Sequence, residues 1–513
     1  MRTIAIVSLL FPLAAAAQEE CPPVETEIDG HRTLRALSLD LRGNVPTVEE
    51  YDAVDSDGEV PEEVIDEWLA SEEFLTRAVR FHRDLLWNNI DNVSLTDYRG
   101  TMGRTDPEEI YWRGRQAVLY RGDEVPCLDQ EAEFGPDGLP IAYLQGDTTW
   151  REGWVWVEPY WYPGTLIKVC AFDAQDGYLS PTGTHCDRLE GYNDAACGCG
   201  PSLAWCRYGY YQEGITQGLA QDVDRRIESV LRDGRTYLDL FTGRQAFVNG
   251  PTVHFWKHQT GIPANVELQP VPVPVEQLPD LDFTETDEWI EIQLGEEHAG
   301  ILTSPAYLLR FQTNRARANR YYNAFMCQPF QPPVGGLPAP GESVPVLDLQ
   351  VRDGCKYCHG LLEPSASYWG RWAQGGGGFL DPVRFPAVRD DCALCAATGS
   401  WCSEECRDHY VVTALTPEED PYLGWLRSYE FRRPEHVDHI EDGPAMLALR
   451  SAVDGRLQGC SAKNAARWLL GRETLPDEDP WVDELGQAFV DSEWDWKALV
   501  KAIVTSPVYG RVQ

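Results

Sequence analysis

Fifteen cysteines constrain this 513-residue chain more than any other feature of its sequence. None of them lies in residues 1–17, where Arg2, an apolar run from Ile4 to Leu13 and four alanines at 14–17 follow the order of a signal peptide. Removal of this peptide on export would deliver the cysteines to an oxidising compartment, where disulfides form and persist. We therefore expect a periplasmic or extracellular protein that is cross-linked by disulfides.

The sequence Cys355-Lys-Tyr-Cys358-His359 predicts a different use for two of these cysteines. Two sulfurs separated by two residues can form thioethers with the two vinyl groups of one porphyrin, and the histidine that follows can bind the iron. A local disulfide between Cys355 and Cys358, or coincidence, would explain the cysteines alone. The adjacent histidine favours one covalently attached haem c, with His359 as its proximal iron ligand.

The number of cysteines also implies that at least one of them has no disulfide partner within the chain. If Cys355 and Cys358 carry a haem, 15 − 2 = 13 cysteines remain, which is an odd number. At least one of them must be a free thiol, an intermolecular bridge or an unusual ligand. The sequence does not identify this cysteine.

A second CxxC sequence lies downstream and has Ala396 where a haem motif needs histidine, so we do not expect a second haem. The cysteines of this segment are Cys392, Cys395, Cys402 and Cys406. With His409 they offer enough ligands for zinc, but the gap between the two pairs is shorter than in common zinc ribbons. Two disulfides are the favoured interpretation in an oxidising compartment.

The sixth iron ligand decides what a haem does, because a methionine or histidine there makes an electron carrier and an open position permits peroxide or oxygen chemistry. Met446, in the helical sequence "GPAMLALRSAV", is the first candidate for this ligand. The other methionines after the signal peptide and the alternative histidines are Met102, Met326, His409, His436 and His439. The sequence "EHVDHI" around the last two histidines also allows a separate metal site.

Apolar periodicity predicts a mainly α-helical protein. In the first helical module, residues 18–104, the segment 31–43 ends on Gly43, a typical helix C-terminal residue, and the segment 61–90 carries an apolar stripe. Helical patterns return in residues 213–333 and in the C-terminal module 413–513.

Three other segments interrupt these helical modules. Residues 105–212 are rich in aromatic residues, glycine and cysteine, and "WVWVEPYWY" at Trp154–Tyr162 alternates like a strand, which predicts a disulfide-rich β insertion. Its aromatic run could bind sugars, but a packed β core explains the same residues. Prolines in residues 334–350 predict a linker, and residues 351–412 hold the haem motif and the Cys-rich segment.

Charge and missing motifs exclude several functions. A net charge of −39 repels nucleic acid and anionic membranes. It also suits contact with a cationic partner, but a solvated acidic surface is the favoured interpretation. The sequence contains no run of about 18 apolar residues, so we expect no transmembrane segment. The sequence contains no GxSxG elbow, HExxH sequence or P-loop, and "QGGGGF" at Gln374–Phe379 is interpreted as a flexible turn near the haem.

Several segments, in the same order, resemble the planctomycete-type cytochrome c family, which comprises exported multi-domain proteins of unknown function. The segments that carry the resemblance are "RTLRALSLDLRGNVPTVEEY", "VIDEWLASEEFLTRAVRFHRDLL", "IESVLRDGRTYLDLFTGRQAFVNG", "AGILTSPAYLLRFQTNRARANRYYNAFMCQPFQPP", "AARWLLGRE" and "LVKAIVTSPVY". They cover most of the chain outside the insertion 105–212. In the family, the haem histidine is commonly followed by a short run ending in Asp-Pro, and here that run is Leu361-Leu362-Glu363-Pro364. Some members have a methionine where Leu362 stands, so a ligand role for that position is absent here.

The motif and the resemblance together imply an exported c-type cytochrome that transfers single electrons to and from an unidentified redox partner. Two alternatives stay open: a haem-dependent oxidase or peroxidase that acts on an extracellular polymer, and a non-enzymatic surface or binding protein with a structural haem. The sequence decides neither whether the protein is an enzyme nor its oligomeric state.

Overall fold

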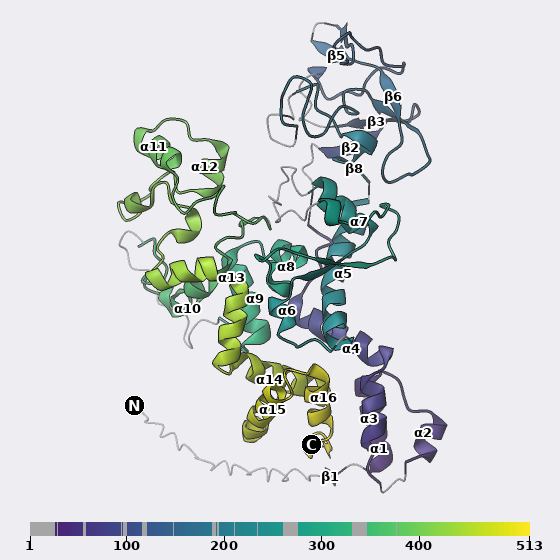
Figure 1. The fold of residues 1–513 in the computed structure, drawn as a ribbon, viewed down its shortest axis with the longest axis vertical. Coiled ribbons are helices and arrows are strands. Elements are labelled where there is room, and N and C mark those ends of the chain that lie inside the picture. Colours follow the sequence, from purple (N-terminus) through teal and green to yellow (C-terminus); the bar gives the residue numbers. More distant parts are fainter. Residues whose placement is uncertain are drawn as a thin grey trace, which may run out of the picture.

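The computed structural model describes residues 26–27, 29–54, 58–93, 95, 100–114, 121–146, 148–186, 191, 194–209, 211–232, 234–259, 275–330, 346–375 and 377–512 (Figure 1). The expected signal peptide and Cys21 lie outside these residues, and so does most of the expected proline-rich linker. The described part is mainly helical with small sheets, as the sequence predicts.

Capping side chains and a glycine with positive φ mark where the N-terminal helices begin and end. The side chain of Asp29 accepts a hydrogen bond from the backbone N–H of Arg32 at the start of the first helix, and Gly43 follows its end with φ of 78°. Thr47 and Glu50 form a capping box at the start of the second. These helices are α1 (Gly30–Leu41), α2 (Val48–Asp52), α3 (Glu62–Leu69) and α4 (Glu72–Leu86).

The helices of the middle of the chain surround a short antiparallel pair of strands. The strands are β9 (Gln245–Val248) and β10 (Ile290–Gln293). The helices are α5 (Tyr211–Arg232), α6 (Asp239–Thr242), α7 (Gly250–His254), α8 (Pro305–Arg310) and α9 (Asn314–Phe325). A cap formed by Asn249 starts α7, and one formed by Thr313 starts α9.

Helices from both ends of the chain share one apolar core. This core includes Leu34 and Phe74 from the N-terminal helices, Tyr321 from α9 and Ile503 from the last helix. The C-terminal helices are α13 (Pro434–Val453), α14 (Arg456–Leu470), α15 (Asp479–Asp491) and α16 (Trp496–Val504). The last of them lies beside α3 (Figure 1), so the two ends of the chain close a single helical body.

Polar contacts join the same two ends. Lys501 of α16 pairs with Asp66 of α3 at 2.8 Å, and the hydroxyl of Tyr509 donates to Asp40 at 2.7 Å. A short antiparallel pair joins β1 (Thr26–Glu27) to β11 (Arg511–Val512). Burial raises the pKa of Asp40, and the hydrogen bond from Tyr509 and the charge of Arg77 only partly oppose that shift.

The expected β insertion, together with residues 101–104 that precede it, forms a separate sheet with its own small apolar clusters. Its strand order is β6-β7-β3-β2-β8. The strands are β2 (Thr101–Arg104), β3 (Ile110–Arg113), β6 (Trp154–Val157), β7 (Ile167–Cys170) and β8 (Arg207–Tyr208), with a separate hairpin of β4 (Tyr143–Gln145) and β5 (Thr149–Arg151). Trp154 and Trp161 are buried, which supports the packed-core interpretation for these two rings, whereas Trp150 and Trp156 are exposed.

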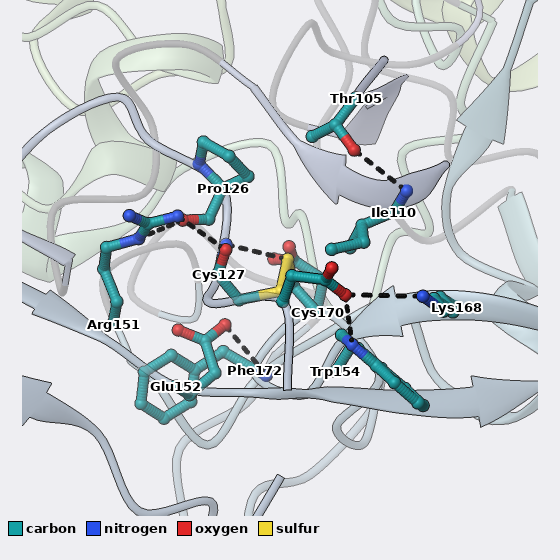
Figure 2. The surroundings of a disulfide bond; sticks show 12 residues. Thr105, Ile110, Pro126, Cys127, Arg151, Glu152, Trp154, Lys168, Cys170 and Phe172 are labelled. Atoms are coloured by element: carbon teal, nitrogen blue, oxygen red, sulfur yellow. Dashed lines mark hydrogen bonds and ion pairs between the residues drawn. A yellow bond between two sulfur atoms is a disulfide. The ribbon is translucent and has the colours of Figure 1, made fainter. Parts of the chain in front are cut away.

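Three disulfides and a buried ionic network hold the insertion together. The disulfides are Cys127–Cys170, Cys186–Cys197 and Cys199–Cys206. Figure 2 shows the first of them, with Arg151 donating to the backbone carbonyls of Pro126 and Cys127. Arg121 pairs with both Glu152 and Asp173 in the interior, and this pairing compensates for the burial of their charges.

The Cys-rich segment also forms disulfides. Cys392 bonds to Cys406 and Cys395 bonds to Cys402, joining α11 (Asp390–Thr398) to α12 (Glu404–His409) and the loop between them. The sequence favoured two disulfides over zinc, and the structure agrees. A sixth disulfide, Cys327–Cys460, links the end of α9 to α14 across the main core.

The six disulfides use twelve of the fifteen cysteines. Among the described residues, only Cys355 and Cys358 stand outside them. The remaining cysteine, Cys21, lies outside the described residues. It is the thirteenth cysteine besides Cys355 and Cys358, which makes that number odd. No helix in the described part of the chain combines the length and apolar character needed to cross a membrane.

The shared core predicts a large cost for a truncation in α16. Leu499 is 1% exposed, so Leu499→Ala should lower the free energy of unfolding by about 2–5 kcal/mol. The same change at Leu394, which is 64% exposed on α11, should cost less than about 0.5 kcal/mol. Denaturant unfolding followed by helical circular dichroism measures both, and equal losses would contradict the assignment of Leu499 to the core.

The cysteine pairing can be checked directly. Digestion of the unreduced protein should release peptides joined through Cys392–Cys406 and Cys395–Cys402, as identified by mass spectrometry. Treatment with EDTA should change neither the thermal unfolding temperature nor the thiol count, because a disulfide sulfur is not a thiolate ligand. Zinc in the purified protein together with four reactive thiols in this segment would refute the pairing.

Candidate functional site

The predicted haem motif lies at the start of α10 (Lys356–Ala366), with Cys355 as the residue before the helix. Gly354 has a φ of 81°, a conformation that glycine adopts without strain, and it turns the chain into the helix. The backbone N–H of His359 then donates to the carbonyl of Cys355 at 3.0 Å. Cys358 and His359 therefore lie one helical turn from Cys355, on the same side of α10.

The motif is accessible. Cys355, Cys358 and His359 are all partly exposed. Tyr357 and Leu361, on the same helix, are 58% and 44% exposed. Because each of them is two residues from His359, these two side chains project from a different side of α10.

His359 is held by a carboxylate from its own helix. Its Nδ1 atom lies 2.7 Å from Oε1 of Glu363, one turn further along α10. The side chain of Glu363 is 6% exposed. An ionised carboxylate can only accept hydrogen bonds, so Nδ1 donates, and in the neutral form of the ring the lone pair lies on the other nitrogen, Nε2.

Two arginines from other parts of the chain fix this carboxylate. Arg315 of α9 donates to Oε1 of Glu363, and Arg432, just before α13, donates to Oε2 and to the backbone carbonyl of Glu363 at 3.0 Å each. Burial raises the pKa of Glu363, but the charges of Arg432 and Arg315 outweigh it, so its pKa lies below the ordinary value. The carboxylate is therefore ionised at neutral pH.

No motif in the sequence predicts this part of the site. Glu363 stands out there only as part of the Glu-Pro departure from the family pattern, and no local pattern marks Arg315 or Arg432. The sequence does hold one signal for Glu363, because a carboxylate four residues after a histidine lies on the same helical face. Nothing local could have identified the two arginines, which reach the site from other elements.

The candidate sixth ligands lie in different surroundings. Met446 follows a kink of α13 at Gly443 and is half-buried against the main core. His439 precedes the kink and lies against α10, where its Nδ1 is 3.0 Å from the carbonyl oxygen of Pro364. Its ring also stacks on Tyr368, with the ring centres 4.2 Å apart. His439 is thus the candidate that contacts the motif helix.

The other candidates are held elsewhere. His409 is nearly buried against Phe385 in the Cys-rich segment. Met102 lies in the insertion near Cys199, and Met326 is buried near Ser451. His436 is buried one turn before His439, with their ring centres 6.1 Å apart. No described hydrogen bond or ring contact joins any of these residues to His359.

In the described part of the chain, groups of side chains that could bind a metal ion occur away from the haem motif. Three potential ligand atoms gather within 4.8 Å of one another in two groups only: Cys127, Glu152 and Cys170, and Asp391, Cys392 and Cys406. In each group the two sulfurs form a disulfide. Cys355, Cys358 and His359 do not form such a cluster, which argues against a zinc site there, and neither do His436 and His439.

Two open hollows also lie away from the motif. One, of about 370 Å³, is lined by Phe81 of α4 and by residues of α14, including Asn464 and Trp468. The other, of about 460 Å³, lies in the insertion beside Pro136 and Phe172. The motif itself is therefore best described as a partly exposed helical face.

A pair of carboxyl groups lies in the segment between α12 and α13. Glu419 is buried, accepts a hydrogen bond from the backbone N–H of Leu415, and contacts Glu430. Burial, then the hydrogen bond and negative charge of Glu419, raise the pKa of Glu430 to about 7. Glu430 therefore keeps its proton over much of the acidic range.

Comparisons with known proteins found no matching family model, no matching curated protein and no matching solved structure.

The raised pKa of Glu430 predicts how stability varies with pH. Because the folded protein raises the pKa of Glu430 from 4.5 to about 7, it binds this proton more tightly than the unfolded chain does. This contribution is fully present below pH 4.5 and is lost as the pH rises to about 7. Glu430→Gln, which is neutral at every pH, should flatten that decline in the free energy of unfolding.

The measurement is urea unfolding at a series of pH values between about 4.5 and 8. Glu418→Gln, at an exposed position nearby, is the control and should keep the wild-type dependence. A Glu430→Gln protein with the same pH slope as wild type would mean that the folded protein does not raise the pKa of Glu430.

Proposed function

We propose that this protein is an exported c-type cytochrome that binds one haem covalently and transfers single electrons. Cys355 and Cys358 would form the two thioether bonds, and Nε2 of His359 would bind the iron. When bound, the haem supplies the one-electron change between ferrous and ferric iron. The chain's own residues would attach it and orient the imidazole.

One observation carries this proposal. Among fourteen cysteines in the described residues, twelve form disulfides, and the two that do not are those of the Cys355–His359 motif. Two thiols three residues apart in a chain rich in disulfides need a chemical explanation. Thioether formation explains both thiols and the histidine that follows them.

Exposure and hydrogen bonding of the motif support a bound macrocycle. The thiols of Cys355 and Cys358 are partly exposed, so they are accessible for attachment. His359 already has its Nδ1 hydrogen-bonded, as histidine ligands of metals commonly do. Its Nε2 atom is the one left for iron.

The sequence supports the same function. The resemblance to the planctomycete-type cytochrome c family covers the helical modules on both sides of the motif. The expected signal peptide would take the chain to a compartment where haem c is attached, and the six disulfides are compatible with such a compartment. We propose Met446 or His439 as the sixth ligand, and the second of these contacts α10 through Pro364.

Loss of the two thiols should abolish covalent haem. The wild-type protein, exported from a host that matures c-type cytochromes, should keep its haem through acid-acetone extraction and carry the mass of one macrocycle. Cys355→Ala/Cys358→Ala should lose all covalent haem, because no thioether can form. Mass spectrometry of the intact protein and its absorption spectrum measure both.

The second CxxC provides a matched control. Cys395→Ala/Cys402→Ala also removes two sulfurs, one of them from a helical CxxC, but it should keep the haem, although it loses one disulfide. A wild-type product without any added macrocycle would refute the proposed function. Cyanide addition separates the carrier from a haem enzyme, since a low-spin spectrum that cyanide leaves unchanged indicates an iron with two protein ligands.

A further inference from the structure

We propose that Glu363 is a positioning residue for the haem iron: it fixes the orientation and tautomer of His359 and lowers the reduction potential of the bound haem. This inference rests on the proposed function. It starts from the 2.7 Å contact between Nδ1 of His359 and Oε1 of Glu363 and from the two arginines that hold the carboxylate.

The carboxylate cannot turn away from the imidazole. Arg432 holds Oε2 and the backbone carbonyl of Glu363, while Arg315 shares Oε1 with His359. The two arginines come from the segment before α13 and from α9, so Glu363 is fixed from two sides. A side chain held in this way keeps a single rotamer, which is what precise positioning of a metal ligand requires.

This contact selects one tautomer of His359. Because the ionised carboxylate accepts and cannot donate, a neutral imidazole at this position keeps its ring proton on Nδ1 and its lone pair on Nε2. The neutral ring is therefore oriented to bind iron through Nε2 before any haem arrives. Without the carboxylate, either ring nitrogen could carry the proton and the ring could rotate about its side-chain bonds.

The same contact tunes the iron. A hydrogen bond to an ionised acceptor is shorter and stronger than one to a neutral acceptor, and it makes the imidazole a better electron donor. A stronger donor favours ferric over ferrous iron, which lowers the reduction potential. The positive charges of Arg315 and Arg432 oppose this lowering of the reduction potential. A test of the role of Glu363 must therefore remove its negative charge and keep both arginines.

A purely structural role would be the competing explanation. Glu363 also joins α9, α10 and the segment before α13, so its loss could act on stability alone. Stability and reduction potential separate the two roles. A matched control exists in Glu478, whose side chain is 7% exposed and pairs with Arg472 at 2.6 Å, away from the motif.

The experiment compares the midpoint potential of the haem-loaded wild type with those of Glu363→Gln and Glu478→Gln, by spectroelectrochemical titration. We expect Glu363→Gln to shift the potential to more positive values and to weaken the iron–imidazole stretching band, and Glu478→Gln to leave both unchanged. An unchanged potential and band in Glu363→Gln, in a protein that does carry haem, would overturn this inference and leave the proposed function intact. Absence of haem from the wild type would instead overturn the proposed function.

A second measurement needs no haem. In the full-length Cys355→Ala/Cys358→Ala chain labelled with ¹⁵N-histidine, nitrogen chemical shifts at pH 8 should report His359 with its proton on Nδ1. Adding Glu363→Gln should produce a mixture of tautomers. A proton on Nε2 in the first chain, or no change on substitution, would overturn the positioning role even if the haem-loaded variant fails to fold.

Discussion

Burial of one apolar core by helices from both ends of the chain is the constraint on which the rest of the structure depends. Residues as distant as Leu34 and Ile503 belong to the same core. Fully burying a large apolar side chain contributes about 1.5–3 kcal/mol, so closing this core far outweighs a surface pair such as Asp66–Lys501. The closed body also sets where α9, α10 and α13 meet.

The candidate site is a consequence of that meeting. Glu363 is buried because α10 packs between α9 and the segment before α13, and a buried carboxylate is stable only when it is paired. The arginines that pair with it also aim it at His359. The same packing that builds the fold thus holds an imidazole with one nitrogen bound and the other available.

Disulfides are concentrated where the main core does not reach. The insertion and the Cys-rich segment have small clusters of their own, and they contain five of the six disulfides. Small units bury too little apolar surface to be stable alone, and cross-links that restrict the unfolded chain compensate for this. Cys327–Cys460 differs because it joins two helices of the main body.

The sequence alone determined the local features, because these depend on neighbours along the chain. Gly43 ends a helix, Thr47 caps the next one, and the spacing of the Cys355–His359 motif puts its side chains on one helical face. Only the tertiary structure decided that Cys127 pairs with Cys170 and Cys327 with Cys460, and that Arg315 and Arg432 meet at Glu363. These partners are more than 40 residues apart, so packing brings them together and no local pattern encodes their contacts.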